Sequence, residues 1–455
     1  MLVDVLGFTI VIPLLSLYAE KFGASPLVAT TLVSVYAVCS LISTPIIGTL
    51  SDRFGRRPLL LVSQAGTCAG FLVLAYSSAL WMVFVGRILD GITAGNLATA
   101  QAYISDHTRP ENRAKAFGVI GVAFGIGFMV GPALGGLLGK YGMHVPFVVA
   151  ACLSALSMVC TYTLLRGEKP VAAAEPAAAP GGQRPSAFDV ATYATYFRRP
   201  RLGALYVQFF LFVFAFSCFT SGFALFAERR FTSDTELKRV GRTCTLRSDD
   251  ELLPSTLAGT IEIDGEPYKV GAWLLASDHT IALVPSTCAA LDRAARPDQV
   301  RAVLPWTERQ VGLLFAFSGL LGIILQGGLI GRLVKRFGEI QLGIAGFVAA
   351  ACAYTLLGFA MTVAMLLVVA VITAFGNGVL RPVITSRITQ AVGRHEQGVA
   401  LGISGSLSSV AMALAPPTGG SLIDRGNLLG WALVPATVAL FGLIASLITR
   451  PPPPA

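Results

Sequence analysis

The sequence predicts an all-α membrane protein of twelve transmembrane helices in two six-helix halves, with a small β-containing insert in the second half. Its composition is the first reason. Hydrophobic residues make up 54% of the chain and charged residues only 13%, whereas soluble domains carry about 25% charged residues. The second reason is that apolar stretches of about 20 residues, long enough to cross a bilayer core of ~30 Å, recur along the chain.

An internal repeat is the third reason. The loop sequence 48–57 recurs at 331–339, with Gly, Arg, Phe and Gly in register, so that Gly48 corresponds to Gly331. A second pair of segments, 131–136 and 415–420, also matches, and its offset differs from that of the first pair by one residue. Two independent matches in nearly one register indicate a duplicated membrane domain, which is how many solute transporters are built.

The apolar stretches place the helices. In the first half we expect spans near 1–20, 28–50, 58–78, 80–104, 115–139 and 144–166. In the second half we expect them near 202–228, 309–333, 340–361, 364–388, 397–422 and 427–449. The first span has no basic lead and no small-residue cleavage site, so no cleavable signal peptide is expected. The predicted organisation is an N-terminal half (1–166), a cytoplasmic linker (167–201), helix seven (202–230), an insert (231–305) and helices eight to twelve (306–450).

The linker is predicted to be partly unfolded. Glu168 to Pro185 is rich in Ala, Pro and Gly and too poor in bulky residues to fold. The stretch that follows predicts either an amphipathic helix on the inner leaflet or a plain basic tether. Its aromatic and basic residues are Phe188, Tyr193, Tyr196, Phe197, Arg198, Arg199 and Arg201.

The length of the insert follows from the repeat. Glu20 matches Glu228 before the insert and Gly48 matches Gly331 after it, and the second interval is longer by about 75 residues. Within the insert, 260–270 predicts a β-hairpin around an Asp-Gly turn, and 280–284 a further extended run. A disulfide between Cys244 and Cys288 would help so small a module on the oxidising side of the membrane. The alternative is a poorly ordered loop with two free thiols.

The basic residues give the topology. Short outer loops hold only Lys21, Lys140 and Arg425, and the other short loops, taken as inner, hold Arg53, Arg56, Arg57, Arg109, Arg113, Lys115, Arg332, Lys335, Arg336 and Arg394. This asymmetry predicts a cell (inner) membrane protein, in contact with lipid, with both termini cytoplasmic and the insert outside. The net charge of +9 follows from this loop pattern, so we expect no nucleic-acid partner.

Charged residues inside apolar spans are functional candidates because burying them in hydrocarbon is costly. Asp4 lies in the first span, Arg87 and Asp90 share one face of the fourth, and Arg381 follows Asn377 in the tenth. An Asp4–Arg87 contact must cover about 10 Å of depth, which a long side chain and helix tilt could nearly supply. The alternative is a closed Arg87–Asp90 pair that only neutralises itself.

These motifs resemble those of the major facilitator superfamily. The segment Gly48-x-x-x-Asp52-Arg53-x-Gly55-Arg56-Arg57 resembles its signature loop, and Gly86-Arg87 with Gly91 and Gly95 is similar to its helix-four motif. The helix-five segment Gly131-Pro132-x-x-Gly135-Gly136 resembles the motif of proton-driven antiporters. The first span, Asp4-x-x-Gly7 with Pro13, resembles that of the tetracycline-resistance-like drug:proton antiporters.

The resemblance implies roles. Asp52 would meet the N-terminal end of helix eleven, where the helix dipole favours a carboxylate, and would latch the inner face with Arg53 and Arg57. The helix-five glycines would pack a neighbour tightly enough to block leakage. The stretches 66–76 and 346–359 hold no Asp or Glu, unlike helices three and nine of tetracycline pumps. That absence puts tetracycline as substrate in doubt and leaves Asp4 and Asp90 as the expected proton carriers.

The sequence therefore favours a proton-driven efflux antiporter of small, drug-like molecules that works by alternating access. The first alternative is a solute-uptake symporter or uniporter of the same fold, and a distant one is a receptor or membrane enzyme that acts through the insert. Catalysis is not expected because no nucleophile–base pair or phosphate-binding Gly loop is found. No metal or cofactor is expected either, since the histidines form no ligand cluster: His107, His144, His279 and His395.

Overall fold

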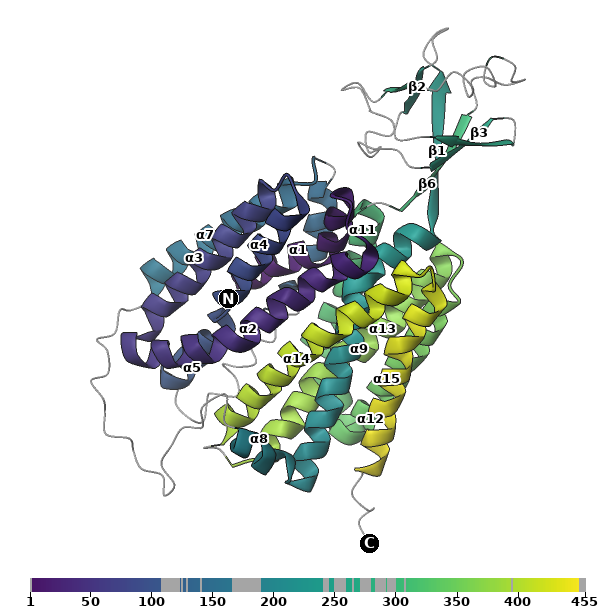
Figure 1. The fold of residues 1–455 in the computed structure, drawn as a ribbon. Helices are drawn as coiled ribbons and strands as arrows, with labels where there is room; N and C mark the ends of the chain where they lie inside the picture. Colours follow the sequence, from purple (N-terminus) through teal and green to yellow (C-terminus); the bar gives the residue numbers. More distant parts are fainter. Residues whose placement is uncertain are drawn as a thin grey trace. The chain divides into compact units, whose positions relative to one another are not determined.

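The computed structural model describes residues 2–107, 123, 126–127, 130–139, 141–165, 190–239, 245–248, 259–263, 266–270, 280–282, 292, 300–306, 308–393 and 396–449. The chain forms two compact units. One comprises Met1–Ala224 with Gly312–Ala455, and the other comprises Leu225–Val311. The first unit is helical and the second is built around a β-sheet (Figure 1).

The first half of the helical unit contains a series of apolar helices. They are α1 (Leu2–Lys21), α2 (Pro26–Phe54), α3 (Arg56–Ala75), α4 (Leu80–Ile92), α5 (Asn96–His107) and α7 (Val145–Leu164). A shorter apolar helix, Val130–Gly139, lies in the fifth predicted span. The start of α2 is fixed by its sequence: the Ser25 side chain accepts a hydrogen bond from Val28 N, and Pro26 occupies the first turn.

The second half follows the linker. Its helices are α8 (Val190–Phe197), α9 (Pro200–Arg230), α11 (Glu308–Ile324), α12 (Ile330–Gly358), α13 (Val363–Gln390), α14 (Gln397–Asp424) and α15 (Leu428–Ile448). A π-helical turn, η2 (Leu325–Leu329), joins α11 to α12. Helix α8 lies where the sequence left open an amphipathic helix or a basic tether.

Among the described residues, eight helices are long and apolar enough to cross a membrane, or nine if the bent α1 is one span. The fifth predicted span is described only in part, and α11 has 17 residues. The prediction of one unbroken helix over 80–104 is wrong, because α4 ends at Ile92 and α5 begins at Asn96. Thr93 and Gly95 lie at this break, where hydroxyl groups from α2 and α3 hydrogen-bond to the backbone.

The repeat is visible in the backbone. Gly55, between α2 and α3, has φ 94° and ψ 155°. Gly338, its counterpart in the repeated loop, has φ 77° and ψ 159° and bends α12. This region of φ and ψ is open essentially to glycine alone. Gly142 and Gly426, which correspond in the register of the second sequence pair, are also both at positive φ. Corresponding loops of the two halves therefore turn with glycines at corresponding positions.

The second unit contains a six-stranded sheet in the order β4-β3-β6-β1-β2-β5. Its strands are β1 (Thr232–Arg239), β2 (Thr245–Ser248), β3 (Gly259–Ile263), β4 (Glu266–Val270), β5 (Thr280–Ala282) and β6 (Val300–Pro305). Strands β3 and β4 pair antiparallel on either side of Asp264 and Gly265, where the sequence predicts a hairpin.

The two ends of this insert lie together. Thr232 pairs with Pro305 in the β1–β6 ladder, and Trp306 N donates a hydrogen bond of 3.1 Å to Phe231 O. The rings of Phe231 and Trp306 also contact, with centroids 5.2 Å apart. An insertion whose ends meet in this way can be added to a short loop at small entropic cost. Cys244 and Cys288, the predicted disulfide, lie outside the described residues.

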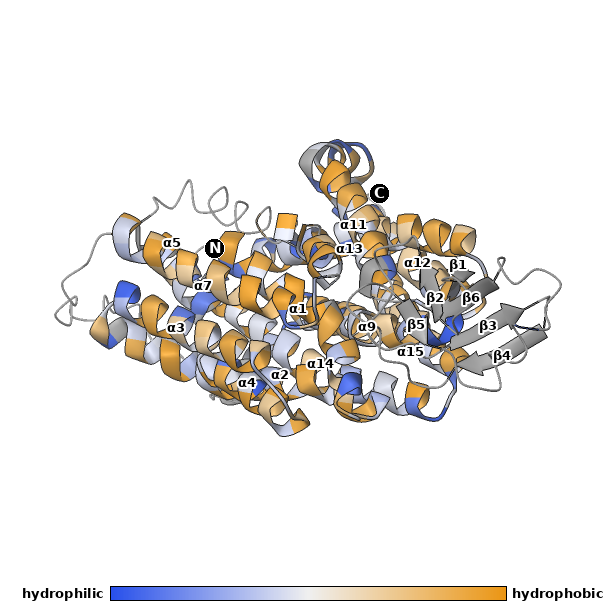
Figure 2. Ribbon diagram, turned by 90° about the horizontal axis from the view of Figure 1, so that it is seen from above, coloured by the Kyte–Doolittle hydropathy of each residue, from blue (hydrophilic) through white to orange (hydrophobic). Residues whose placement is uncertain are grey.

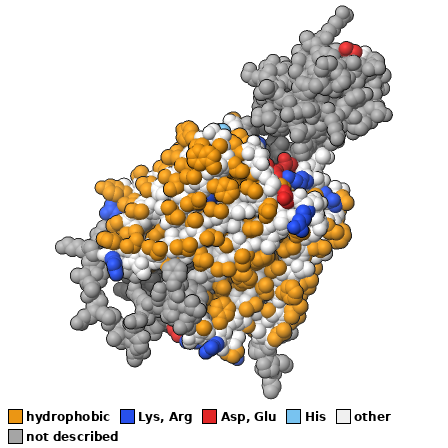
Figure 3. All heavy atoms as spheres, viewed as in Figure 1, with side chains coloured by type: hydrophobic (Ala, Val, Ile, Leu, Met, Phe, Trp, Pro, Cys, Tyr) orange, Lys and Arg blue, Asp and Glu red, His pale blue; other side chains and the backbone are white. Residues whose placement is uncertain are grey.

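The helical unit presents an apolar surface. Hydrophobic side chains cover most of the described face in Figure 3, and hydrophobic residues dominate the helices in Figure 2. The side chains of Trp81, Val159 and Phe441 are 66%, 58% and 61% exposed. So much exposed apolar surface on long helices is typical of a protein that lies in lipid.

Candidate functional site

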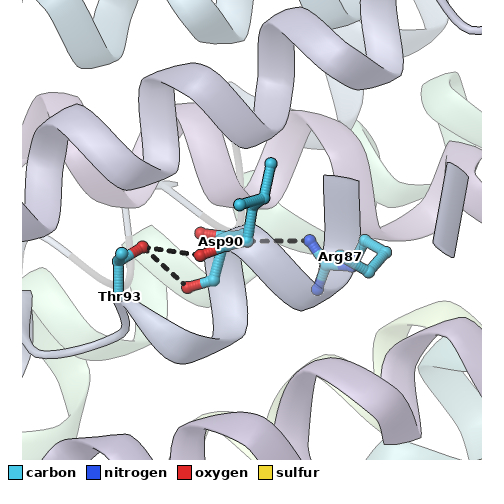
Figure 4. A network of polar contacts seen from close by, with 4 residues as sticks. Arg87, Asp90 and Thr93 are labelled. Atoms are coloured by element: carbon cyan, nitrogen blue, oxygen red, sulfur yellow. Dashed lines mark hydrogen bonds and ion pairs between the residues drawn. The ribbon is translucent and has the colours of Figure 1, made fainter. Parts of the chain in front are cut away.

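Two oppositely charged side chains form a buried pair in α4. Arg87 Nη1 donates to Asp90 Oδ2 at 2.9 Å, one helical turn away (Figure 4). Arg87 is 1% exposed and Asp90 3%. The Arg87 guanidinium also lies over the Tyr36 ring of α2, 4.5 Å from its centroid, and Thr67 of α3 hydrogen-bonds to Asp90. The closed pair that the sequence offered as an alternative is therefore the arrangement observed.

The helix break beside this pair is held by hydroxyl groups. Thr93 Oγ1 donates to Leu89 O at 2.8 Å and to Asp90 O at 3.3 Å (Figure 4). Ser63 of α3 donates to Thr93 O and accepts from Gly95 N at 2.9 Å. From α2, Ser43 donates to Gly91 O and Thr44 to Ala94 O. Irregular backbone is tolerated in a membrane only where it is satisfied in this way.

Asp4 has a partner that the sequence did not suggest. Gln64 Nε2 of α3 lies 3.3 Å from each Asp4 carboxylate oxygen and 2.9 Å from Ser157 Oγ of α7. Ser154 Oγ donates to the backbone oxygen of Gln64 at 3.0 Å. Asp4 is half-buried and Gln64 is 2% exposed. The structure thus gives Asp4 a contact to α3, and gives Arg87 a contact to Asp90.

The helix-five glycines pack on α1. A Cβ atom added at Gly131 would collide with Thr9, and one at Gly135 would lie 2.8 Å from Ile10 O. Gly127, one turn earlier, meets Val5 in the same way, and Thr9 Oγ1 donates to Gly127 O at 2.8 Å. The glycines at intervals of four therefore form a close seam with the helix that carries Asp4.

The other face of helix five meets the second half of the protein. A Cβ at Gly312 of α11 would lie 2.6 Å from Gly136 Cα and 2.9 Å from Pro132 O. The corresponding contact joins α14 to α2, where a Cβ at Gly420 would collide with Thr30. By contrast, no described residue lies within 4 Å of a Cβ added at Gly48, Gly402 or Gly405. Helices α2 and α14 are thus closely packed at Thr30 and Gly420, and the glycines nearer the α2–α3 loop are not packed in this way.

The basic residues of the α2–α3 loop bind within their own half. Arg56 Nη1 donates to Ser51 Oγ at 2.6 Å. Arg57 donates to Tyr162 O of α7 and lies 4.8 Å from the centroid of the Tyr162 ring. Arg53 is exposed, and Gly48 and Asp52 lie in the last two turns of α2. The Asp52 side chain lies outside the described part of the structure.

The polar candidates of the second half lie in α13. Tyr354 Oη of α12 donates to Asn377 Oδ1 at 3.3 Å, and the Tyr354 ring lies beside Phe219 of α9, with centroids 5.3 Å apart. Arg381 lies one turn beyond Asn377 and is exposed. The two residues therefore lie on the same side of α13.

The sequence comparisons decide the family. Residues 1–236 and 273–455 match the Major Facilitator Superfamily. The chain belongs to the major facilitator superfamily. It is 28% identical over 420 residues to the class C tetracycline resistance protein of Escherichia coli, covering 91% of this chain and 85% of that protein.

One further relative and one solved structure are also similar to the chain. Identity to multidrug resistance protein 1 of Bacillus subtilis is 23%, covering 92% of this chain and 86% of that protein. Among solved structures, the human organic anion transporter MFSD10 superposes with a TM-score of 0.63 at 19% identity, over 98% of this chain and 96% of that chain. The chain is accordingly a multi-pass membrane transporter of this superfamily and not an enzyme.

Sequence reasoning missed the polar residues of α3 in this transporter. Ser63, Gln64 and Thr67 contact the helix break, Asp4 and Asp90 respectively. Their signal was present, since Ser63-Gln64-x-x-Thr67 interrupts an apolar span with residues that need partners in lipid.

Proposed function

We propose that this chain is a proton-driven efflux antiporter of small, drug-like molecules that works by alternating access. The observation that carries the proposal is the position of Asp4. Asp4 lies next to Val5 on α1. This is the helix against which the antiporter-motif glycines Gly131 and Gly135 pack. A proton taken up by Asp4 would change the charge of α1, and α1 is the helix on which these glycines pack. The relatives named for drug resistance support the same direction of transport.

The buried pair supplies a second site for proton coupling. While Asp90 is ionised, Arg87 neutralises it inside the helical unit. Protonation of Asp90 would release a cation in a low-dielectric setting, which is costly and would favour a different arrangement of α4. The break at Thr93–Gly95 begins three residues after Asp90, so α4 and α5 could move separately. Asp4 and Asp90 are thus the proposed proton carriers, with Arg87 as counter-ion.

We further propose twelve spans with both termini cytoplasmic and the 231–305 insert on the outer side, as a small β-containing module. On that topology, the glycine contacts at Gly312 and Gly420 close the outer side of the transport path. The ends of α2 and α14 near Gly48 and Gly402 would then be on the inward-facing side. Asp52 with Arg53 and Arg57 would latch this side shut in the opposite state, and Asn377 and Arg381 would line the substrate path.

The test is drug-induced proton release from inside-out membrane vesicles that contain the protein, with compounds chosen from a growth-inhibition panel. The wild type should release protons, and Asp4→Asn should release none while reaching the membrane in normal amount. Normal release in the Asn variant would move the role to Asp90. Substrate accumulation in whole cells under an inward proton gradient would instead indicate an uptake symporter.

A further inference from the structure

We infer that Gln64 is a positioning residue for Asp4, and that its side-chain amide holds the carboxylate in its ionised form while linking it to α7. The role of Gln64 in transport rests on the proposed function, whereas its contact with Asp4 is observed in the structure. Gln64 lies near the middle of α3 (Arg56–Ala75), buried between the helix that carries Asp4 and the helix that carries Ser157.

The amide has two N–H groups, and both are used. One faces the Asp4 carboxylate, with Nε2 3.3 Å from each oxygen. The other faces Ser157 Oγ at 2.9 Å. The backbone of Gln64 is fixed as well, because Ser154 Oγ donates to its carbonyl oxygen at 3.0 Å. Two serines of α7, one turn apart, therefore set the position from which Gln64 reaches Asp4.

This arrangement discriminates between the two forms of Asp4. A donor that faces both oxygens stabilises a carboxylate, and hydrogen bonds to ionised acceptors are stronger than neutral ones. A protonated Asp4 offers this N–H group only a neutral carbonyl or hydroxyl oxygen, which is a weaker acceptor than a carboxylate oxygen. Proton uptake therefore weakens the Gln64 contact, and the same contact favours the ionised form of Asp4.

The unused atom of the amide shows where a rearrangement could lead. Gln64 Oε1 is buried and has no hydrogen-bond partner among the described residues, and a buried polar atom in that condition is unfavourable. If the amide reversed, Oε1 would face Asp4 and accept a hydrogen bond from its protonated carboxyl. The Ser157 hydroxyl would then donate to Oε1, so the hydrogen bond between α3 and α7 would be kept with its direction reversed.

The charged side chains on the described parts of α3 and α4 have partners of their own. Arg87 and Asp90 of α4 neutralise each other, and Arg56 and Arg57 of α3 bind Ser51 and Tyr162. The remaining titratable side chains in the apolar, described parts of α2, α3 and α7 are tyrosines and cysteines: Tyr36, Cys39, Cys68, Cys152, Cys160 and Tyr162.

The test is the pH dependence of carbodiimide labelling at Asp4. A hydrophobic carbodiimide reacts with protonated carboxyl groups in membranes, so the labelled fraction of the Asp4 peptide, measured by mass spectrometry on the purified full-length protein, reports protonation without a substrate. Gln64→Met keeps the length of the side chain and removes both donors. We expect its labelling midpoint to lie about one pH unit above that of the wild type, a tenfold change in proton affinity.

Matched variants separate positioning from packing. Gln208→Met makes the same change at a buried glutamine of α9 whose amide bonds to Ala445 O and Thr449, and its midpoint should equal that of the wild type. Ser157→Ala should move the midpoint by less than Gln64→Met, because the donor to Asp4 remains. Asp4→Asn removes the labelled site and identifies the peptide.

An unmoved midpoint in Gln64→Met, or an equal shift in Gln208→Met, would overturn the inference. The vesicle assay distinguishes its failure from that of the proposed function. If Asp4→Asn exchanges normally, the antiport role of Asp4 fails whatever the labelling shows. If Asp4→Asn is inactive and the Gln64→Met midpoint is unmoved, only the role of Gln64 fails.

Discussion

The two halves of the helical unit share a backbone and differ in what they bury. Gly55 and Gly338 take the same unusual conformation, and the glycines of helix five and of α14 pack on corresponding helices. Gly135 meets Ile10 of α1, and Gly419, the counterpart of Gly135, meets Cys218 of α9. Cys218 is itself the counterpart of Ile10 in the register that matches Glu20 with Glu228, so the repeat extends to individual contacts.

The polar network of the first half has no equivalent at the corresponding positions of the second. In the registers of the repeat, Asp4 corresponds to Phe212, Gln64 to Phe347 and Asp90 to Thr373, which are all buried. A duplicated scaffold has therefore kept its packing while its buried polar chemistry diverged. Under the proposed function, proton coupling would then belong to the first half, and Asn377 and Arg381 in the second half would serve another purpose.

The largest expected effect is on the buried pair. Arg87→Leu leaves Asp90 buried without its counter-ion, which destabilises a folded protein by about 3–5 kcal/mol. Thr373→Val, at the position corresponding to Asp90, should be neutral or slightly stabilising, because Thr373 Oγ1 is buried without a hydrogen-bond partner among the described residues. Thermal unfolding of the purified protein in detergent measures both.

A double variant shows whether charge is the cause. Arg87→Leu with Asp90→Leu removes both charges, and it should recover much of the stability lost in Arg87→Leu alone. A double variant as unstable as Arg87→Leu would show that the pair matters for its shape and not for its charge.

The next effect concerns the glycine seams. Gly135→Ala should destabilise the protein by about 1–3 kcal/mol, since backbone atoms that cannot move aside obstruct the added methyl group. Gly419→Ala should do less, because its obstacles are the side chains of Cys218 and Trp431. Gly405→Ala is the control, as the new Cβ meets no described residue within 4 Å. Unfolding temperature and passive proton leak into vesicles should change in the same order, and equal effects at all three sites would contradict the seam.

A smaller and symmetric effect is expected at the loop glycines. Gly55→Ala and Gly338→Ala each force a side chain into a backbone region open essentially to glycine, at a cost of about 1–2 kcal/mol. Because both positions have nearly the same φ and ψ, the two variants should lower the unfolding temperature by the same amount. A marked difference would mean that the repeat does not extend to the energetics of these turns.

The two six-helix halves could be predicted from the sequence because the features that define them are local. Span length, the register of the repeated loops and the glycines of helix five depend on short stretches of chain, and the structure places Gly131 and Gly135 in a close helix contact. The Gln64–Asp4 and Ser63–Gly95 contacts could not be predicted in the same way, since each joins residues far apart in the chain. The break after Ile92 was missed for a related reason. Thr93 and Gly95 are compatible with a helix, and the hydroxyls that satisfy the break come from α2 and α3.

The smallest effect is expected where α9 and α14 begin. Arg199, which precedes α9, forms a two-bonded ion pair with Glu396, which precedes α14, at 2.8 and 2.9 Å. The hydrogen bonds from Arg199 lower the pKa of Glu396 below its usual value. A carboxylate with a lowered pKa in the folded protein stabilises it above the pKa of the unfolded chain, and this contribution is lost as pH falls through the folded value.

Both side chains are exposed, Arg199 by 43% and Glu396 by 36%, so solvent screens the pair to about 0.2–1 kcal/mol. Arg199→Ala should therefore lower the unfolding temperature slightly at pH 7, and high salt should reduce the difference. At a pH where Glu396 is protonated, wild type and variant should unfold at the same temperature. Arg198→Ala, one residue away, is the control for general loss of positive charge. A difference that persists unchanged in acid would show that Arg199 acts through its packing on Tyr196, whose ring centroid lies 4.7 Å from the guanidinium, and not through the ion pair.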